Sequence, residues 1–132
     1  MRKIILIFFC CLSVIMFLNF KNTNEGVVRY AALGDSYTIG TGANTNEAWP
    51  VLLTKHLNDA GIKTELVANP SKNGFSTQNL IDVELPIFDK SGATFVTLLI
   101  GVNDWVRNVN GSTFTKYLIY ILVHFHCKLP NK

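Results

Sequence analysis

The sequence predicts a three-layer α/β/α protein, in which a parallel sheet is covered by helices on both faces. Three apolar segments, the third rich in β-branched residues, alternate with segments whose apolar residues recur at helical spacing. The strand segments are apolar almost throughout, which is typical of strands buried on both faces of a parallel sheet. Right-handed crossovers favour a doubly wound order, and in such sheets ligands bind beyond the carboxyl ends of the strands.

The first 26 residues precede this pattern and are expected to direct the chain out of the cell. Arg2 and Lys3 stand before an uncharged apolar stretch, residues 4–18, and polar residues follow from Asn19. A short basic region before such a stretch is typical of a secretory signal, whereas a spanning helix needs about 20 apolar residues. We expect a cleaved signal peptide at 1–26, with an uncleaved membrane anchor as the alternative, and an exported domain at 27–132.

The first predicted strand spans residues 27–33 (VVRYAAL) and ends at Gly34. A loop rich in Gly, Thr and Asn follows at 38–46. Apolar residues then recur at helical spacing from Trp49 to Leu57, with Pro50 in a position typical of a first helical turn and Gly61 where a helix would stop.

Two further strands and two further helices are predicted after Gly61. Residues 64–68 (TELVA) and 93–100 (ATFVTLLI) have the composition of strands. The segment 77–85 is predicted as a short helix that Ser76 or Thr77 caps and Pro86 ends. A final helix, capped by Ser112 or Thr113, is predicted to run to about Leu129.

The composition of the chain argues against several classes of function. The 132 residues are 48% hydrophobic with a net charge of +3, and from Val27 onward nine Lys/Arg stand against eight Asp/Glu. A nucleic-acid binder would show clustered basic residues, so no nucleic-acid partner is expected. Beyond the apolar stretch the chain has Cys127 alone, which excludes a disulfide framework or a cysteine-rich zinc site.

Polar residues and glycines follow each of the three predicted strands. Gly34-Asp35-Ser36 ends the first, a loop with Asn69 and Gly74 follows the second, and Gly101-Val102-Asn103-Asp104 follows the third. A serine at a strand-to-helix turn presents its hydroxyl to the crevice. Backbone N–H groups and an Asn side chain aimed at one point stabilise an oxyanion, so this set favours acyl transfer.

These three blocks, in this order, resemble those of the GDSL, or SGNH, hydrolases. The resemblance covers roughly residue 27 to the C-terminus and implies a flavodoxin-like parallel sheet of the SGNH type. It implies that Ser36 is the nucleophile of an esterase or lipase. The oxyanion hole would comprise the backbone N–H groups of Ser36 and Gly74 and the side-chain amide of Asn103. The implied substrate is a small ester of a lipid, sugar or other alcohol, with no cofactor and no metal.

One element of the family pattern is absent from the sequence. The family carries its base and the acid that orients it as Asp-x-x-His near the C-terminus, and these 132 residues contain no such block. His56, His124 and His126 fall on predicted helices away from the catalytic edge. We therefore expect the last third of a family domain to be missing, the fold to be partly closed, solubility to suffer and activity to be nearly lost. The uncharged third strand would form an exposed edge, and residues 117–125 (YLIYILVHF) are apolar on nearly every side.

Three other functions remain open. The loop with Gly40 and Gly42 follows a strand as in phosphate-binding sites, but it lacks the third glycine of the dinucleotide fingerprint and the lysine of a P-loop. A metal-dependent phosphoesterase could use Asp35 and Asp104 as ligands. A secreted binding module could retain the cleft without catalysis, and the absent base favours this alternative over the other two.

Overall fold

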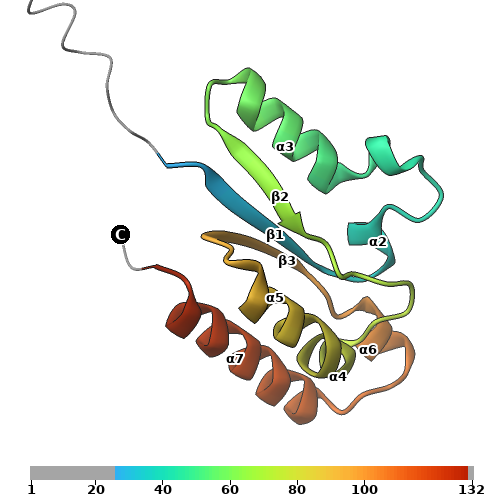
Figure 1. The fold of residues 1–132 in the computed structure, drawn as a ribbon. Helices are drawn as coiled ribbons and strands as arrows, with labels where there is room; N and C mark the ends of the chain where they lie inside the picture. Colours follow the sequence, from blue (N-terminus) through green and yellow to red (C-terminus); the bar gives the residue numbers. More distant parts are fainter. Residues whose placement is uncertain (1–25, 131–132) are drawn as a thin grey trace, which may run out of the picture.

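The computed structural model describes residues 26–130, which form a three-stranded parallel sheet with helices on both faces (Figure 1). The strands are β1 (Val28–Gly34), β2 (Thr64–Ala68) and β3 (Phe95–Leu99), in the order β2-β1-β3. This confirms the predicted three-layer α/β fold. The expected signal or anchor segment, apart from its last residue, lies outside the described residues.

The helices divide between the two faces of the sheet. The helix α3 (Trp49–Asp59) covers one face, and α5 (Leu85–Ser91) and α7 (Gly111–Lys128) cover the other (Figure 1). The apolar core lies under α5 and α7, where burial of large side chains stabilises the packing of helix on sheet. Its buried members are Ala31, Leu33, Leu80, Leu85, Phe88, Ile121 and Phe125.

The register of the sheet brings the strand ends together. β1 pairs in parallel with β3 from Tyr30 opposite Phe95 to Gly34 opposite Leu99. The Tyr30 and Phe95 rings lie 5.2 Å apart. The carboxyl ends of β1 and β3 therefore meet at the same level, and β3 is an edge strand as predicted.

Three short helices occur where the sequence indicated loops. The segment 38–46, predicted as a loop, overlaps α2 (Ser36–Ile39) and the 3₁₀ helix η1 (Thr45–Glu47), and α6 (Val102–Val106) follows β3. Local capping explains two of them. Asp35 caps α2, and a capping box joins Asn44 to Glu47 in η1. Helices this short lack the apolar periodicity on which the prediction rested.

The sequence predicted that the helix after β2 ends before Pro86, and this prediction is wrong. The helical segment runs from α4 (Thr77–Asn79) through a π-helical turn, η2 (Leu80–Glu84), into α5. Because Pro86 falls in the first turn of α5, its missing N–H does not interrupt the hydrogen bonding of that helix. The Leu85 N–H bonds back to the Leu80 carbonyl, five residues earlier, which is the π-helical spacing.

The last helix begins slightly earlier than predicted. α7 starts at Gly111 because Asn110, rather than Ser112 or Thr113, is its cap: the Asn110 side chain accepts the Ser112 N–H at 2.8 Å. Ile121 and Phe125 are buried against the core. Within residues 26–130, no helix combines the length and apolarity that a bilayer crossing requires.

Candidate active site

Ser36 stands at the sharp turn from β1 into α2. Asp35, only 1% exposed, accepts the Tyr37 N–H at 3.0 Å through Oδ1 and so fixes the turn. Ser36 is the first residue of α2, where a backbone N–H has no acceptor inside the helix. Its amide is therefore available to a substrate oxygen, and its side chain is partly exposed.

Gly34 is required at the end of β1 for steric reasons. A Cβ atom at this position would lie 2.3 Å from the Leu99 carbonyl oxygen and 2.3 Å from Thr38 Oγ1. β3 and α2 thus approach the backbone of residue 34 more closely than any side chain allows. The glycine of Gly-Asp-Ser therefore has a packing role that is separate from catalysis.

Asn103 joins the ends of β1 and β3. Its Nδ2 donates to the Phe75 carbonyl at 2.9 Å and lies 3.4 Å from Asp35 Oδ2. The second contact is weak by length, so that one amide hydrogen has no strong acceptor. The structure thus brings Asn103 into contact with the residue that precedes Ser36, at the edge where a ligand is expected.

Residues 74–77 are tied to α6 by side chains that flank Asn103. Arg107, beside α6, donates to the Gly74 carbonyl at 2.6 Å. Asp104, 3% exposed, accepts the Thr77 N–H at 2.9 Å and the Thr77 hydroxyl at 2.6 Å. These bonds hold Gly74, whose φ of 77° suits glycine, next to Asn103.

A cleft of about 430 Å³ opens beside Ser36. Its lining includes Trp49, which is thus a cleft-wall aromatic. Trp105 is 79% exposed and lines a separate pocket between α6 and α7. The residues that line the cleft are Ser36, Tyr37, Gly40, Thr41, Ala43, Glu47, Ala48 and Trp49.

A buried carboxyl that sequence reasoning missed lies beneath the turn. Glu84, in η2, is 0% exposed and accepts the Gly34 N–H at 2.9 Å through Oε2. Burial, together with the nearby charge of Asp35, raises the pKa of Glu84 to about 8, although the Gly34 N–H acts in the opposite direction. No sequence pattern predicts the burial of Glu84, because a glutamate in a helix is ordinarily exposed.

None of the three histidines lines the cleft beside Ser36. His56 and His126 are exposed on α3 and α7. His124 lies 2.8 Å from Asp89 and is held there as part of the contact between α7 and α5. All three histidines therefore occupy helix positions, as predicted, and none of them lines the cleft beside Ser36.

The geometry weakens two of the alternatives. Both carboxylate oxygens of Asp104 accept hydrogen bonds from Thr77, and residues 26–130 contain no group of three side chains that could hold a metal ion. Gly40 ends α2 in a left-handed conformation, and a Cβ there would lie 2.7 Å from the Ala48 Cβ. This glycine is explained by the turn and its packing, without a phosphate.

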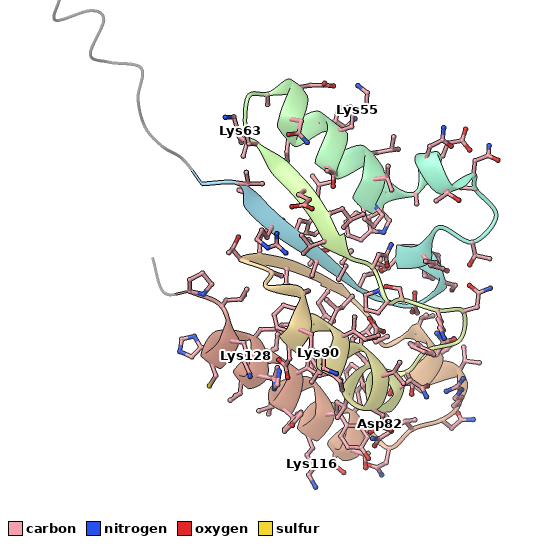
Figure 2. All side chains as sticks on the ribbon, viewed as in Figure 1. Lys55, Lys63, Asp82, Lys90, Lys116 and Lys128 are labelled. Atoms are coloured by element: carbon pink, nitrogen blue, oxygen red, sulfur yellow. The ribbon has the colours of Figure 1, made fainter. Side chains whose placement is uncertain are left out.

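The lysines labelled in Figure 2 are spread over α3, α5, α7 and the turn before β2. These five lysines do not gather on one element, whereas a nucleic-acid interface is expected to show clustered basic residues.

Comparison with family models shows to which family the chain belongs. The model described as the GDSL-like lipase/acylhydrolase family matches residues 32–132. The chain belongs to this family. Its Gly-Asp-Ser turn, the Gly74 loop and the Gly101–Asp104 segment stand at three successive strand ends, as the resemblance implied. No curated protein matches the sequence.

Solved structures share the SGNH hydrolase fold with this family member. AlinE4, an SGNH-hydrolase family esterase, is 23% identical with a TM-score of 0.69, over 83% of this chain and 58% of that one. The esterase EstA from Pseudoalteromonas sp., in a structure inhibited by monoethylphosphonate, is 19% identical with a TM-score of 0.69, over 76% and 55%. TesA is 22% identical with a TM-score of 0.63, over 70% and 50%. The match thus spans between 50% and 58% of each of these structures.

Proposed function

We propose that this chain is an ester hydrolase that transfers an acyl group to Ser36. The observation that carries the proposal is the contact of Asn103 Nδ2 with Asp35, because it joins the serine turn to the amide of the third block. The available N–H of Ser36 and the anchored Gly74 loop lie at the same edge of the sheet. Membership of the GDSL-like family supports an ester substrate.

The mechanism follows from these groups. The Ser36 Oγ attacks the ester carbonyl carbon, and its proton passes to a base. The negative charge that develops on the carbonyl oxygen is stabilised by the backbone N–H groups of Ser36 and Gly74 and by Asn103 Nδ2. The alcohol leaves with a proton, and water then hydrolyses the acyl-serine ester to release the acid.

We further propose that this chain alone turns over very slowly. No histidine lines the cleft, and the sequence has no Asp-x-x-His block. Without an imidazole, Ser36 must lose its proton to solvent, and removal of the base from a serine protease lowers turnover about 10⁶-fold. A single acyl or phosphonyl transfer to Ser36 is therefore a better readout than steady-state hydrolysis.

The test is covalent labelling by an activated alkyl phosphonate, such as a p-nitrophenyl ester. The Ser36 Oγ–P bond forms, p-nitrophenolate leaves, and the serine proton passes to solvent. We predict one adduct per chain, mapped to Ser36 by peptide mass spectrometry and absent in Ser36→Ala. Labelling of both proteins at equal rates would refute a reactive Ser36.

A binding module that retains the cleft is the second candidate, and the absence of an imidazole at the cleft favours it. The same experiment separates the two functions. A non-catalytic module would bind an ester, as measured by calorimetry, and Ser36 would show no reactivity above that of an exposed serine such as Ser112.

Export is a separate proposal, which rests on Arg2, Lys3 and the apolar residues 4–18. Expression in a bacterium with a C-terminal tag should place the product outside the cytoplasm. Its mass would show whether residues before Val27 are removed. Replacement of Leu12 and Ile15 by Asp should retain the protein in the cytoplasm, and unchanged export of that variant would contradict the proposal.

A further inference from the structure

Glu84 is a carboxyl group that the proposed mechanism does not use. It comes from the π-helical turn η2 and is buried below the point where β1 ends. Its Oε2 accepts the Gly34 N–H at 2.9 Å, and its Oε1 has no hydrogen-bond partner within residues 26–130. A buried carboxyl with one bond is costly to keep, so its retention needs an explanation.

The bond from Glu84 acts on the turn that presents Ser36. Gly34 is the last residue of β1, Asp35 caps α2, and Ser36 is the first residue of α2. Leu99 and Thr38 crowd the α-carbon of Gly34, so this residue has no side chain with which to anchor itself. Its N–H is thus a point at which another element can fix the turn.

We propose that Glu84 is a positioning residue for Ser36: its carboxyl accepts the Gly34 N–H and so fixes the turn that presents the serine to the cleft. This inference rests on the proposed function. The π-helical turn supports it. The extra residue of a π-turn changes the direction of the side chains that follow, and such turns are frequent at functional sites.

The charges around Glu84 indicate that it acts as a neutral acid. No salt bridge among the described residues includes it, and the Asp35 carboxylate raises its pKa further. Charged groups on neighbouring elements have partners of their own: Asp82 bonds to Gln78, Asp104 to Thr77, and Asp89 to His124 and Lys128. Loss of the proton would place two carboxylates beside one turn.

Three variants test the proposal. Glu84→Gln keeps an oxygen acceptor for Gly34 and cannot ionise, whereas Glu84→Leu has a similar volume and no acceptor. Asp82→Asn is the matched control, because Asp82 lies two residues away on the same turn and is exposed (Figure 2). The readout is the rate constant for phosphonylation of Ser36, measured from pH 6 to 10.

At pH 7 we expect Glu84→Gln and Asp82→Asn to react within about two-fold of the wild-type rate, and Glu84→Leu at least ten-fold more slowly. Above pH 8 the wild-type and Asp82→Asn rates should level off or fall, while the Glu84→Gln rate keeps rising as more of the serine ionises. A purely structural role would change the melting temperature but leave the pH profiles of wild type and Glu84→Gln parallel.

Two results overturn the proposal. One is parallel pH profiles for wild type and Glu84→Gln, which remains decisive even if Glu84→Leu does not fold. The other is a folded Glu84→Leu variant that reacts like wild type.

A second measurement separates failure of this inference from failure of the proposed function. If Ser36 reacts in no variant, the backbone amide resonances of Gly34, Asp35 and Ser36 are followed by NMR against pH. Joint shifts with a midpoint near pH 8, absent in Glu84→Gln, support the positioning role without reactivity. Resonances that do not titrate in wild type overturn it.

Discussion

Asp104 stabilises the fold by accepting hydrogen bonds from Thr77, although it stands next to Asn103 of the candidate site. Its two oxygens hold the backbone and the hydroxyl of Thr77 inside the protein. We predict that Asp104→Ala lowers the free energy of unfolding by about 2–4 kcal/mol, since it leaves a buried donor unsatisfied. Urea denaturation measures this loss, and Asp82→Asn, a change at an exposed acid, serves as the control. A loss below 0.5 kcal/mol would show that the Thr77 anchor is dispensable.

Glu84 makes the stability of the protein depend on pH. The pKa of Glu84 is about 8 in the folded protein, against 4.5 for an unperturbed glutamate. The native state therefore binds the proton more tightly, and this group's stabilising contribution is full below about pH 4.5 and is lost as pH rises toward 8. The slope is at most about 1.4 kcal/mol per pH unit. Thermal unfolding of Glu84→Gln should show a flatter profile between pH 5 and 8, and an unchanged slope would contradict the burial argument.

The residues of the candidate site could be predicted from the sequence, but the residues that hold them in place could not. Ser36 and Asn103 were predictable because short motifs at strand ends identify them. Glu84 was not, because its role depends on the tertiary contact with Gly34, fifty positions away. The structural role of Asp104 likewise depends on a tertiary contact, its hydrogen bonds from Thr77.

At the scale of elements, α6 and the loop that follows it form a clamp on the segment after β2. Arg107 is exposed and donates to Gly74 and to Asn79. We predict that Arg107→Ala changes the free energy of unfolding by less than about 1 kcal/mol, because the bonds are solvent-exposed. The same variant should label at Ser36 about three- to ten-fold more slowly, because Gly74 loses its anchor. Lys116→Ala, a change at a distant exposed cation, should have no effect on labelling, and an equal loss in both variants would argue against the clamp.

The strands and the long helices were predictable from apolar patterns, and the short helices were not. β1, β2 and β3 follow from short, largely apolar segments, and α3 follows from apolar residues that recur at helical spacing. The extension of the second helical segment through Pro86 could not be predicted, since a π-turn has no sequence signal of its own. Nor could α6, whose five residues are fixed by Asn103 and Asp104 rather than by periodicity.

At the scale of the whole molecule, large apolar side chains are exposed on several elements, β3 and α7 among them. β3 is an edge strand with Phe95 and Leu99 exposed, and α7 exposes a further apolar group. Unpaired strand edges and apolar patches promote association, so the poor solubility that the sequence suggested stays a prediction. The exposed apolar residues of α7 are Ile119, Tyr120, Leu122 and Val123.

A charged pair on α7 should reduce this association. Ile119→Glu with Val123→Lys places a favourable i,i+4 pair on positions that are 56% exposed. We predict less aggregate by light scattering and an unchanged circular dichroism spectrum. Thr115→Glu, an exposed polar position on the same helix, is the control. Equal aggregation of the double variant and wild type would mean that α7 is not the source.

We propose that the Ser36 hydroxyl, the Gly74 N–H and the Asn103 amide face one reacting carbonyl group: the hydroxyl faces its carbon, and the two N–H donors face its oxygen. The most direct test is a crystal structure of the chain after reaction with an alkyl phosphonate. We expect phosphorus bonded to Ser36 Oγ, with the phosphoryl oxygen within about 3 Å of Asn103 Nδ2 and of the Gly74 and Ser36 nitrogens. Phosphorus on another residue, or a phosphoryl oxygen that points away from Asn103 and Gly74, would contradict it.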